Sequence, residues 1–301
     1  MSPSRAMLPE GVYTALITPF RHGALDRAAW DRLVIRQIEA GVAGIVPAGC
    51  TGEAAALNVE EREWMVRRCV ELAAGRCCVL AGSGTNVTAS TIEMTQLVKD
   101  WGADAAMLIS PYYNKPQQHG LVAHYTAAAR AVAIPQVIYN VPGRTAVNIL
   151  PATAALIATE PNVAAIKEAS GDLDQIAQMC SIPELQVFSG DDGLNMEILR
   201  LGAVGAVSVL SNLLPGTLVR MWNAWRLGDE AAADSLAAAV APVVDACFRE
   251  TNPVPTKELL AMMGFCTHET RLPLVPALSE NRTWLQTFHE TVLTPLLEGE
   301  R

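Results

Sequence analysis

The segment GIVPAGCTGEAAAL, residues 44–57, joins a short apolar run to an alanine-rich stretch of helix-forming composition. Between the two lies the turn 49–53, in which Cys50 and Thr51 stand between two glycines and are followed by Glu53. Short apolar runs without polar alternation are typical of parallel strands that are covered on both faces. The segment therefore predicts a strand, a polar turn and a helix, which together form one β-then-α unit.

The same unit recurs eight times along the chain. Strands are predicted at 12–18, 43–48, 77–82, 105–110, 136–140, 163–167, 186–190 and 205–210. Helical spacing is found at 26–40, 58–74, 88–101, 119–131, 149–159, 172–181, 191–201 and 215–227, with Asn58 and Thr88 as predicted starting residues. No GxGxxG fingerprint follows the first strand, which argues against an open dinucleotide-binding sheet. Eight consecutive units predict an α/β fold of the closed (β/α)8 barrel type.

Beyond the eighth unit the pattern is helical only. Helical segments are predicted at 229–248, 254–264 and 280–297, and no further strand is expected. We therefore expect a catalytic barrel domain at residues 1–227 and a helical extension at 228–301 that packs on it.

Composition excludes several classes of protein. The chain has 301 residues, half of them hydrophobic, and a formal net charge of −9 without a basic stripe, which argues against nucleic-acid binding. Its apolar runs are too short to span a bilayer, and its N-terminus lacks the apolar core of a signal peptide. Seven dispersed cysteines and five dispersed histidines show no paired metal-ligand spacing. These features predict a cytoplasmic protein with reduced thiols and no metal site.

A barrel of this type has its active site at the carboxyl ends of the strands. Lys167 ends the sixth predicted strand, VAAIK, and is the most informative residue there. It could be held in an ion pair with Glu168 or with another carboxylate at a strand end. Alternatively, a partly apolar setting would lower its pKa and make the neutral amine available to attack a ketone and form a Schiff base.

Other strand ends carry hydroxyl and guanidinium groups. Tyr139 ends the fifth strand and could either fill the core or transfer protons beside an imine. Tyr112 and Tyr113 follow the fourth strand and could serve packing or add further hydroxyls. Arg144 lies in a Pro-Gly turn, where its planar fork suits a carboxylate, although a solvated loop arginine is the alternative.

Thr51 and three acidic residues also lie near the strand ends. Thr51 and the backbone of its turn could form a small carboxylate pocket at a helix N-terminus. Glu53 is interpreted as a first-turn acid favoured by the helix dipole. Asp191 and Asp192 open a predicted helix and are interpreted as capping residues rather than as a metal pair.

Seven segments together resemble a known enzyme family. They are GCTGE (49–53), SPYYNKP (110–116), YNVPGRT (139–145), IKEASGD (166–172), FSGDD (188–192), GAVSV (205–209) and ETNPVPTK (250–257). In this order the chain resembles the dihydrodipicolinate synthase and N-acetylneuraminate lyase family of pyruvate-dependent class I aldolases.

The resemblance implies specific roles. Lys167 would form the imine with pyruvate, so that no separate cofactor is needed, and Thr51 with neighbouring N–H groups would hold the pyruvate carboxylate. Tyr139 would be the general acid and base, in a relay with the residue at position 50 and with Tyr113 from a neighbouring subunit. A homotetramer is implied by that last contact.

The segment YNVPGRT resembles the synthase branch of the family. There Arg144 would bind the carboxylate of a second substrate, aspartate semialdehyde, and the product would be hydroxytetrahydrodipicolinate. Gly190 and the Val207 carbonyl would line the pocket.

One residue departs from the synthase pattern. Cys50 stands where threonine is expected, and a thiol is a weaker hydrogen-bond donor than an alcohol. The leading hypothesis is a lysine-biosynthesis enzyme that condenses pyruvate with aspartate semialdehyde. The alternative is a catabolic relative that cleaves or dehydrates a 2-keto-3-deoxy sugar acid or another 2-oxo acid. A pyruvate-binding barrel without catalytic activity is a third hypothesis.

Overall fold

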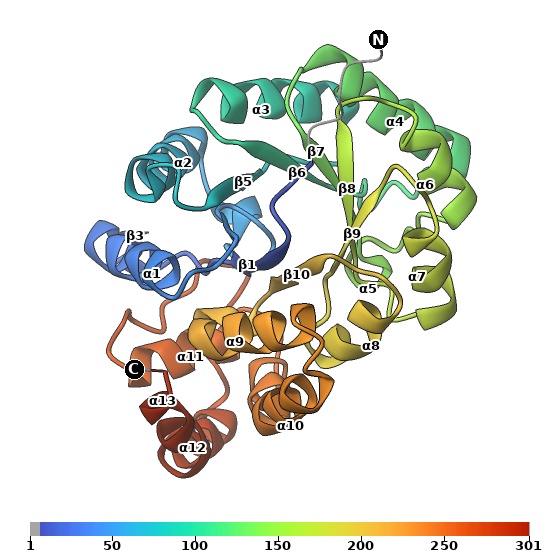
Figure 1. Ribbon diagram of the computed structural model, residues 1–301. Helices are drawn as coiled ribbons and strands as arrows, with labels where there is room; N and C mark the ends of the chain where they lie inside the picture. Colours follow the sequence, from blue (N-terminus) through green and yellow to red (C-terminus); the bar gives the residue numbers. More distant parts are fainter. Residues whose placement is uncertain (1–6, 301) are drawn as a thin grey trace. The chain divides into compact units, whose positions relative to one another are not determined.

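A computed structural model describes residues 7–300 of the chain. Its main sheet is a closed barrel with the strand order β1-β10-β9-β8-β7-β6-β5-β4, in which the described pairs are parallel (Figure 1). The barrel strands are β1 (Gly11–Ala15), β4 (Gly44–Val46), β5 (Cys78–Gly82), β6 (Ala105–Ile109), β7 (Gln136–Asn140), β8 (Val163–Glu168), β9 (Gln186–Ser189) and β10 (Gly205–Ser208). The predicted (β/α)8 barrel is confirmed.

Burial explains why these short segments are strands. Every residue of β1, β5, β7 and β8 is buried, although β8 ends in two charged residues, Lys167 and Glu168. Branched and small apolar side chains on both faces suit a parallel sheet that is covered on its two sides. The strands are therefore apolar until their carboxyl ends, where the polar residues begin.

A helix follows each barrel strand. These helices are α1 (Arg27–Glu39), α2 (Val59–Ala73), α3 (Thr88–Asp100), α4 (Gln118–Ala131), α6 (Pro151–Ile157), α7 (Leu173–Cys180), α8 (Asn195–Arg200) and α9 (Pro215–Arg226). Asn58 caps α2 as predicted, in a capping box with Glu61. The predicted start at Thr88 is wrong by one residue, because Val87 occupies the N-cap and the Thr88 hydroxyl pairs with His124.

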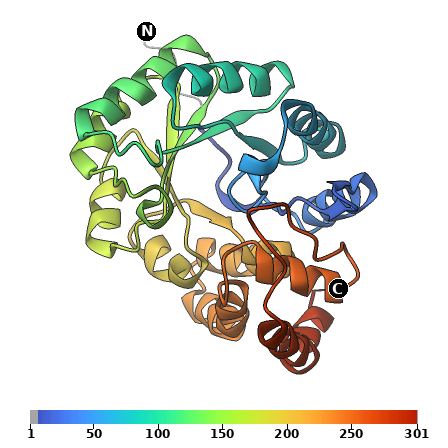
Figure 2. The ribbon, with the colours of Figure 1, turned by 180° about the vertical axis from the view of Figure 1, so that it is seen from behind.

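The chain divides into two compact units. The first unit contains Cys78–Val207 and the described part of residues 1–10, and the second contains Gly11–Cys77 and residues 208–300. In the first unit, strands β5 to β10 pair in sequence order. Helices α3, α4, α6 and α7 form one continuous outer layer over β5 to β9, as both views show (Figures 1 and 2).

The second unit holds β1, β4 and all the C-terminal helices. Helix α1 packs on α2, where Arg68 makes two hydrogen bonds to Asp31 at 2.9 and 2.7 Å. The C-terminal segment forms α10 (Glu230–Cys247), α11 (Val254–Met262), α12 (Ser279–Phe288), a π-helical turn (His289–Leu293) and α13 (Thr294–Glu298). Helix α10 packs on α9, and α11 packs on α12. A domain boundary between residues 227 and 228 stays a prediction.

Two elements were not expected from the sequence. A short antiparallel hairpin, β2 (Phe20–Arg21) with β3 (Ala24–Leu25), follows β1. A four-residue helix, α5 (Pro142–Thr145), occupies the predicted Pro-Gly turn after β7. Both are too short to leave a periodic pattern of apolar residues. Among residues 7–300, no helix is long and apolar enough to cross a membrane.

His124 is a buried titratable residue in the outer layer of the first unit. It is 4% exposed, and its Nδ1 lies 2.9 Å from the Thr88 hydroxyl. Burial lowers the pKa of His124 from 6.5 to about 4. Between these two values the unfolded chain binds a proton that the folded chain does not, so acidification favours unfolding.

We expect the urea midpoint of unfolding to fall as the pH is lowered from 6.5 to 4, and to fall less in the variant His124→Gln. The glutamine keeps a polar partner for Thr88 but does not titrate. Urea titrations of both proteins at several pH values measure the difference. Equal pH slopes in the two proteins would contradict the role of His124.

Candidate active site

Lys167 and Tyr139 are neighbours on adjacent strands of the first unit. The two residues pair in register between β8 and β7. Each is 5% exposed, and the Lys167 Nζ lies 4.1 Å from the centre of the Tyr139 ring. A primary amine and a phenol therefore lie together in a largely apolar setting, as an amine nucleophile with a proton-transferring neighbour requires.

Glu168, which was the alternative partner of Lys167, has hydrogen bonds elsewhere. Its carboxylate accepts from the Asn140 side chain at 3.0 and 3.2 Å and from the Ser170 backbone N–H at 2.8 Å. Burial raises the pKa of Glu168, and these donors oppose the rise. Successive side chains of a strand point to opposite faces, so Lys167 and Glu168 are directed away from each other. This geometry favours the amine as a nucleophile.

Asn140 connects this carboxylate to a wider polar network. Its Nδ2 also donates to the Asn148 Oδ1 at 2.8 Å, and Asn148 exchanges two hydrogen bonds with the Gln175 side chain. The network joins the end of β7 to α7. Through Asn140 it also holds the Glu168 carboxylate at the carboxyl end of β8. Sequence reasoning did not find it, because amide side chains carry no distinctive spacing.

Gly190 lies directly beside the Lys167 side chain. A Cβ atom at Gly190 would stand 2.9 Å from the Lys167 Cε and 2.8 Å from the Ala169 Cβ. The backbone N–H of Gly190 donates to the Glu168 carbonyl at 2.8 Å, which holds this close approach in place. Gly190 therefore lies against the Lys167 side chain, and its predicted role in lining the pocket stays a prediction. Val207 lies on β10 and is 2% exposed, and the role of its carbonyl stays a prediction.

Arg144 and Tyr113 are both exposed in the first unit. Arg144 lies in α5, whose last residue, Thr145, donates from its hydroxyl to the Val141 and Val147 carbonyls at 3.1 and 3.0 Å. Tyr113 is 89% exposed and has a left-handed backbone with φ of 74°. Their predicted roles toward a second substrate and a neighbouring subunit stay predictions.

The turn 49–53 belongs to the second unit. Cys50 is half-buried, and its carbonyl accepts from the Glu53 N–H at 3.1 Å. Thr51 is 4% exposed, and its hydroxyl oxygen accepts from the Asn252 Nδ2 at 2.9 Å. The Thr18 hydroxyl donates to the Gly52 carbonyl at 2.7 Å. The turn is therefore held at three successive residues.

The predicted role of Glu53 as a first-turn acid is wrong. Glu53 has a left-handed backbone with φ of 52° and precedes only the three-residue helix η1 (Ala54–Ala56), while α2 begins at Val59. Its carboxylate is buried against the Lys257 ammonium at 2.7 Å. The turn 49–53 is therefore followed by the short 3-10 turn η1, and not by the N-terminus of a longer helix as predicted.

Acidic residues after β9 behave as predicted. Asp191 caps the short helix η2 (Asp192–Leu194) by accepting from the Gly193 N–H at 3.0 Å, and Asp192 accepts from the Asn195 Nδ2 at 3.2 Å. In the part of the chain that the structure describes, no group of three or more His, Cys, Asp or Glu residues could hold a metal ion.

Comparison with known proteins places the chain in a family. Residues 8–291 match the sequence profile of the Dihydrodipicolinate synthetase family. The chain belongs to this family. The curated 4-hydroxy-tetrahydrodipicolinate synthase of Leptospira biflexa is 41% identical over 292 residues, which are 96% of this chain and 99% of that protein.

Solved structures of the family agree with this fold. Dihydrodipicolinate synthase of Thermotoga maritima matches with a TM-score of 0.93 and 39% identity, covering 95% of this chain and 99% of its own. The chloride-inhibited dihydrodipicolinate synthase of Acinetobacter baumannii, solved in complex with pyruvate, matches with a TM-score of 0.92 and 37% identity, covering 96% and 99%. These findings confirm the family that the seven segments predicted.

The variant Gly190→Ala tests the packing around the Lys167 side chain. The added Cβ must displace the Lys167 side chain, and we expect borohydride trapping of pyruvate on Lys167 to slow on the order of tenfold. Mass spectrometry of the trapped protein over time measures this rate. Gly120→Ala in helix α4 is the control, because its Cβ would meet only one side-chain atom within 4 Å, at 3.3 Å. Equal trapping rates in the two variants would contradict the inference that the packing at Gly190 positions the Lys167 amine.

Proposed function

We propose that this chain is a 4-hydroxy-tetrahydrodipicolinate synthase that condenses pyruvate with aspartate semialdehyde through an imine on Lys167. The observation that carries the proposal is the buried amine of Lys167 beside the Tyr139 ring, in a chain that belongs to the dihydrodipicolinate synthetase family. The pyruvate complex of the Acinetobacter baumannii relative supports pyruvate as the first substrate.

The imine step uses the two residues on β7 and β8. The neutral Lys167 amine attacks the ketone carbon of pyruvate, a C–N bond forms, and the ketone oxygen leaves as water. Tyr139 delivers and accepts the protons that this step requires, since its ring lies beside the amine. The resulting iminium acidifies the methyl group, and loss of a proton gives an enamine whose carbon attacks the aldehyde. No separate cofactor is needed for this sequence of steps.

Two carboxylates must be recognised, one on each substrate. Thr51 and the backbone N–H groups of its turn bind the pyruvate carboxylate, because the hydroxyl is buried and fixed in position. Arg144 binds the carboxylate of aspartate semialdehyde, for which its exposed position on α5 and its bidentate fork are suited. Gly190 and the Val207 carbonyl line the pocket beside Lys167 in this proposal.

The proposed assembly is a homotetramer. In this assembly, which the family resemblance implies, a neighbouring subunit would cover the exposed Tyr113 ring and receive its hydroxyl in the proton relay. A cytoplasmic location stays a prediction of the sequence.

Cys50 is the one residue that favours the alternative reaction. A thiol transfers protons through weaker hydrogen bonds than an alcohol. A catabolic relative would form the Lys167 imine with the 2-oxo group of a 2-keto-3-deoxy sugar acid, and would then release an aldehyde by cleavage or water by dehydration. A non-catalytic pyruvate-binding barrel would lack turnover with any aldehyde.

Borohydride trapping followed by an acceptor panel tests the proposed function. We expect pyruvate to add a reducible adduct to Lys167 in the native protein and none in Lys167→Met. Among aldehydes, aspartate semialdehyde should be consumed with the highest kcat/KM. Absence of an adduct removes every imine mechanism, and a higher kcat/KM with a sugar-derived aldehyde supports the catabolic alternative.

The substitution Cys50→Thr decides what the thiol does. If the synthase reaction is the native one, the hydroxyl should strengthen the relay, and we expect a several-fold higher kcat with aspartate semialdehyde, within the roughly 100-fold range of proton-transfer catalysis. Steady-state kinetics with both substrates measure it, with Cys180→Thr as a control outside the turn. A lower kcat would indicate that the thiol is adapted to another acceptor.

A further inference from the structure

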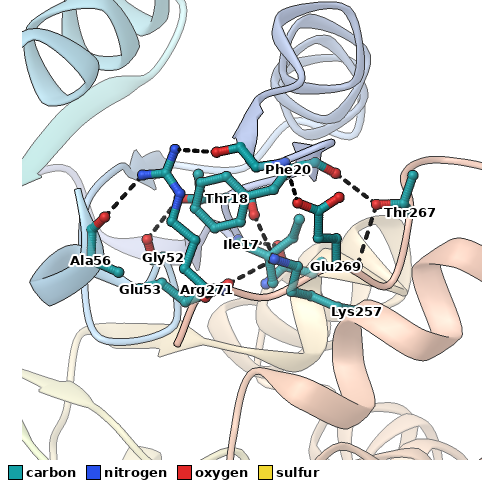
Figure 3. Close-up of polar contacts among 12 residues, drawn as sticks. Ile17, Thr18, Phe20, Gly52, Glu53, Ala56, Lys257, Thr267, Glu269 and Arg271 are labelled. Atoms are coloured by element: carbon teal, nitrogen blue, oxygen red, sulfur yellow. Dashed lines mark hydrogen bonds and ion pairs between the residues drawn. The ribbon is translucent and has the colours of Figure 1, made fainter. Parts of the chain in front are cut away.

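A buried ion pair joins Glu53, the last residue of the turn that carries Thr51, to Lys257 on α11. The Lys257 side chain extends from α11 and is 0% exposed, and the facing Glu53 side chain is 1% exposed (Figure 3). The Lys257 ammonium donates to the Glu53 Oε1 at 2.7 Å and to the Thr18 carbonyl at 2.8 Å. Its Nζ also lies 4.5 Å from the centre of the Phe20 ring. Lys257 thus connects α11 to the turn 49–53 and to Thr18, which follows β1.

Glu53 itself occupies an unfavourable backbone conformation. A residue with a Cβ at φ of 52° and ψ of 39° costs roughly 1–2 kcal/mol relative to right-handed conformations. The carboxylate compensates by accepting from the Lys257 ammonium and, through Oε2, from the Arg271 backbone N–H at 3.0 Å. Figure 3 shows Lys257 and Arg271 reaching the same carboxylate from two separate segments. The turn therefore keeps this shape because distant residues hold Glu53.

Arg271 is in turn fixed by its own contacts. Its guanidinium lies 4.2 Å from the Phe20 ring centre, donates to the Ala56 carbonyl at 2.9 Å and pairs with Glu61 on α2 at 2.5 Å. The Arg271 backbone N–H consequently has little freedom to move away from Glu53.

Asn252 fixes the hydroxyl of Thr51. The Asn252 Nδ2 donates to the Thr51 Oγ1 at 2.9 Å, and both residues are buried. A hydroxyl that accepts this hydrogen bond directs its own hydrogen elsewhere. The Thr51 O–H is then oriented as a donor, which is what a carboxylate ligand requires.

We propose that Asn252 and the Lys257–Glu53 ion pair are positioning residues that orient the Thr51 hydroxyl and its turn toward the carboxylate of pyruvate. The proposal rests on the proposed function, because Thr51 is assigned to pyruvate there. Asn252 sets the direction of the hydroxyl, and the ion pair sets the backbone of the turn. These residues act through Thr51 and do not touch the substrate.

A purely structural role makes a different prediction. Burying two charges is expensive, and removing both at once is often neutral for stability, whereas removing one leaves an uncompensated charge. The double variant Glu53→Gln with Lys257→Met therefore tests the turn without leaving a buried charge. A purely structural pair would leave pyruvate binding unchanged in every variant that folds.

The experiment measures the pyruvate concentration that gives half-maximal borohydride trapping on Lys167. We expect it to rise about tenfold in Asn252→Leu, since a lost hydrogen bond to a charged group has this effect. A similar rise is expected in the Glu53→Gln, Lys257→Met double variant. Because the contact to the carboxylate is the same before and during reaction, kcat should change by less than about threefold.

A double-mutant cycle identifies the path through Thr51. In a Thr51→Val background, Asn252→Leu should cause no further rise, because the hydroxyl that it orients is gone. The same tenfold rise in both backgrounds would overturn the proposal for Asn252.

The matched control breaks a neighbouring ion pair on the same helix. Glu258 on α11 pairs with Arg282 on α12 at 3.0 Å, and Glu258→Gln should lower stability without changing the half-saturating pyruvate concentration. Equal effects of Glu258→Gln and the double variant would overturn the proposal for the ion pair.

Failure of the inference and failure of the proposed function give different results. If the native protein forms no pyruvate adduct, the proposed function fails and the inference falls with it. If the native protein is trapped normally but all variants have the native half-saturating concentration, only the positioning role is refuted.

Discussion

A barrel whose strands are buried on both faces can accept polar side chains only where partners meet them. This constraint decides the arrangement of the protein, because an unpaired buried charge costs several kcal/mol or more. Strand β8 is apolar through Ile166 and then places Lys167 and Glu168 on opposite faces. Glu168 is satisfied by amide and backbone donors outside the strand, and Lys167 lies against an aromatic ring. The Lys167 amine is thereby directed away from the carboxylate that follows it in the sequence.

The same constraint operates at the turn 49–53, where the solution is different. There the buried Glu53 carboxylate accepts from the buried Lys257 ammonium, which lies 204 positions away in the sequence. The pair and the Thr18 hydroxyl leave the turn little conformational freedom. Preorganisation of this kind is how a protein presents hydroxyl and N–H donors to an anion without reorganising on binding.

Much of the architecture could be predicted because the repeating apolar runs and helical spacing are local signals. Seven of the eight predicted helices after barrel strands have boundaries within two residues of those observed, and the exception is 191–201, where α8 begins only at Asn195 after a short 3-10 turn. Lys167 and Tyr139 were found because each ends an apolar strand. Glu53 was misinterpreted because its helix-dipole role follows from neighbours in sequence, whereas its actual partners, Lys257 and Arg271, are distant. Long-range pairing of this kind leaves no trace in local composition.

The ion pair gives the C-terminal helices a structural role in the turn 49–53. A chain ending at Arg226 would retain every barrel strand and the amine on β8, yet it would lack the Lys257 ammonium and the Arg271 N–H that meet the Glu53 carboxylate. Replacing these helices with a segment that lacks a lysine at this position would leave the Glu53 carboxylate unpaired and should destabilise the turn 49–53. The turn near the start of the barrel thus depends on residues beyond its end, through the contacts of Lys257, Arg271 and Asn252.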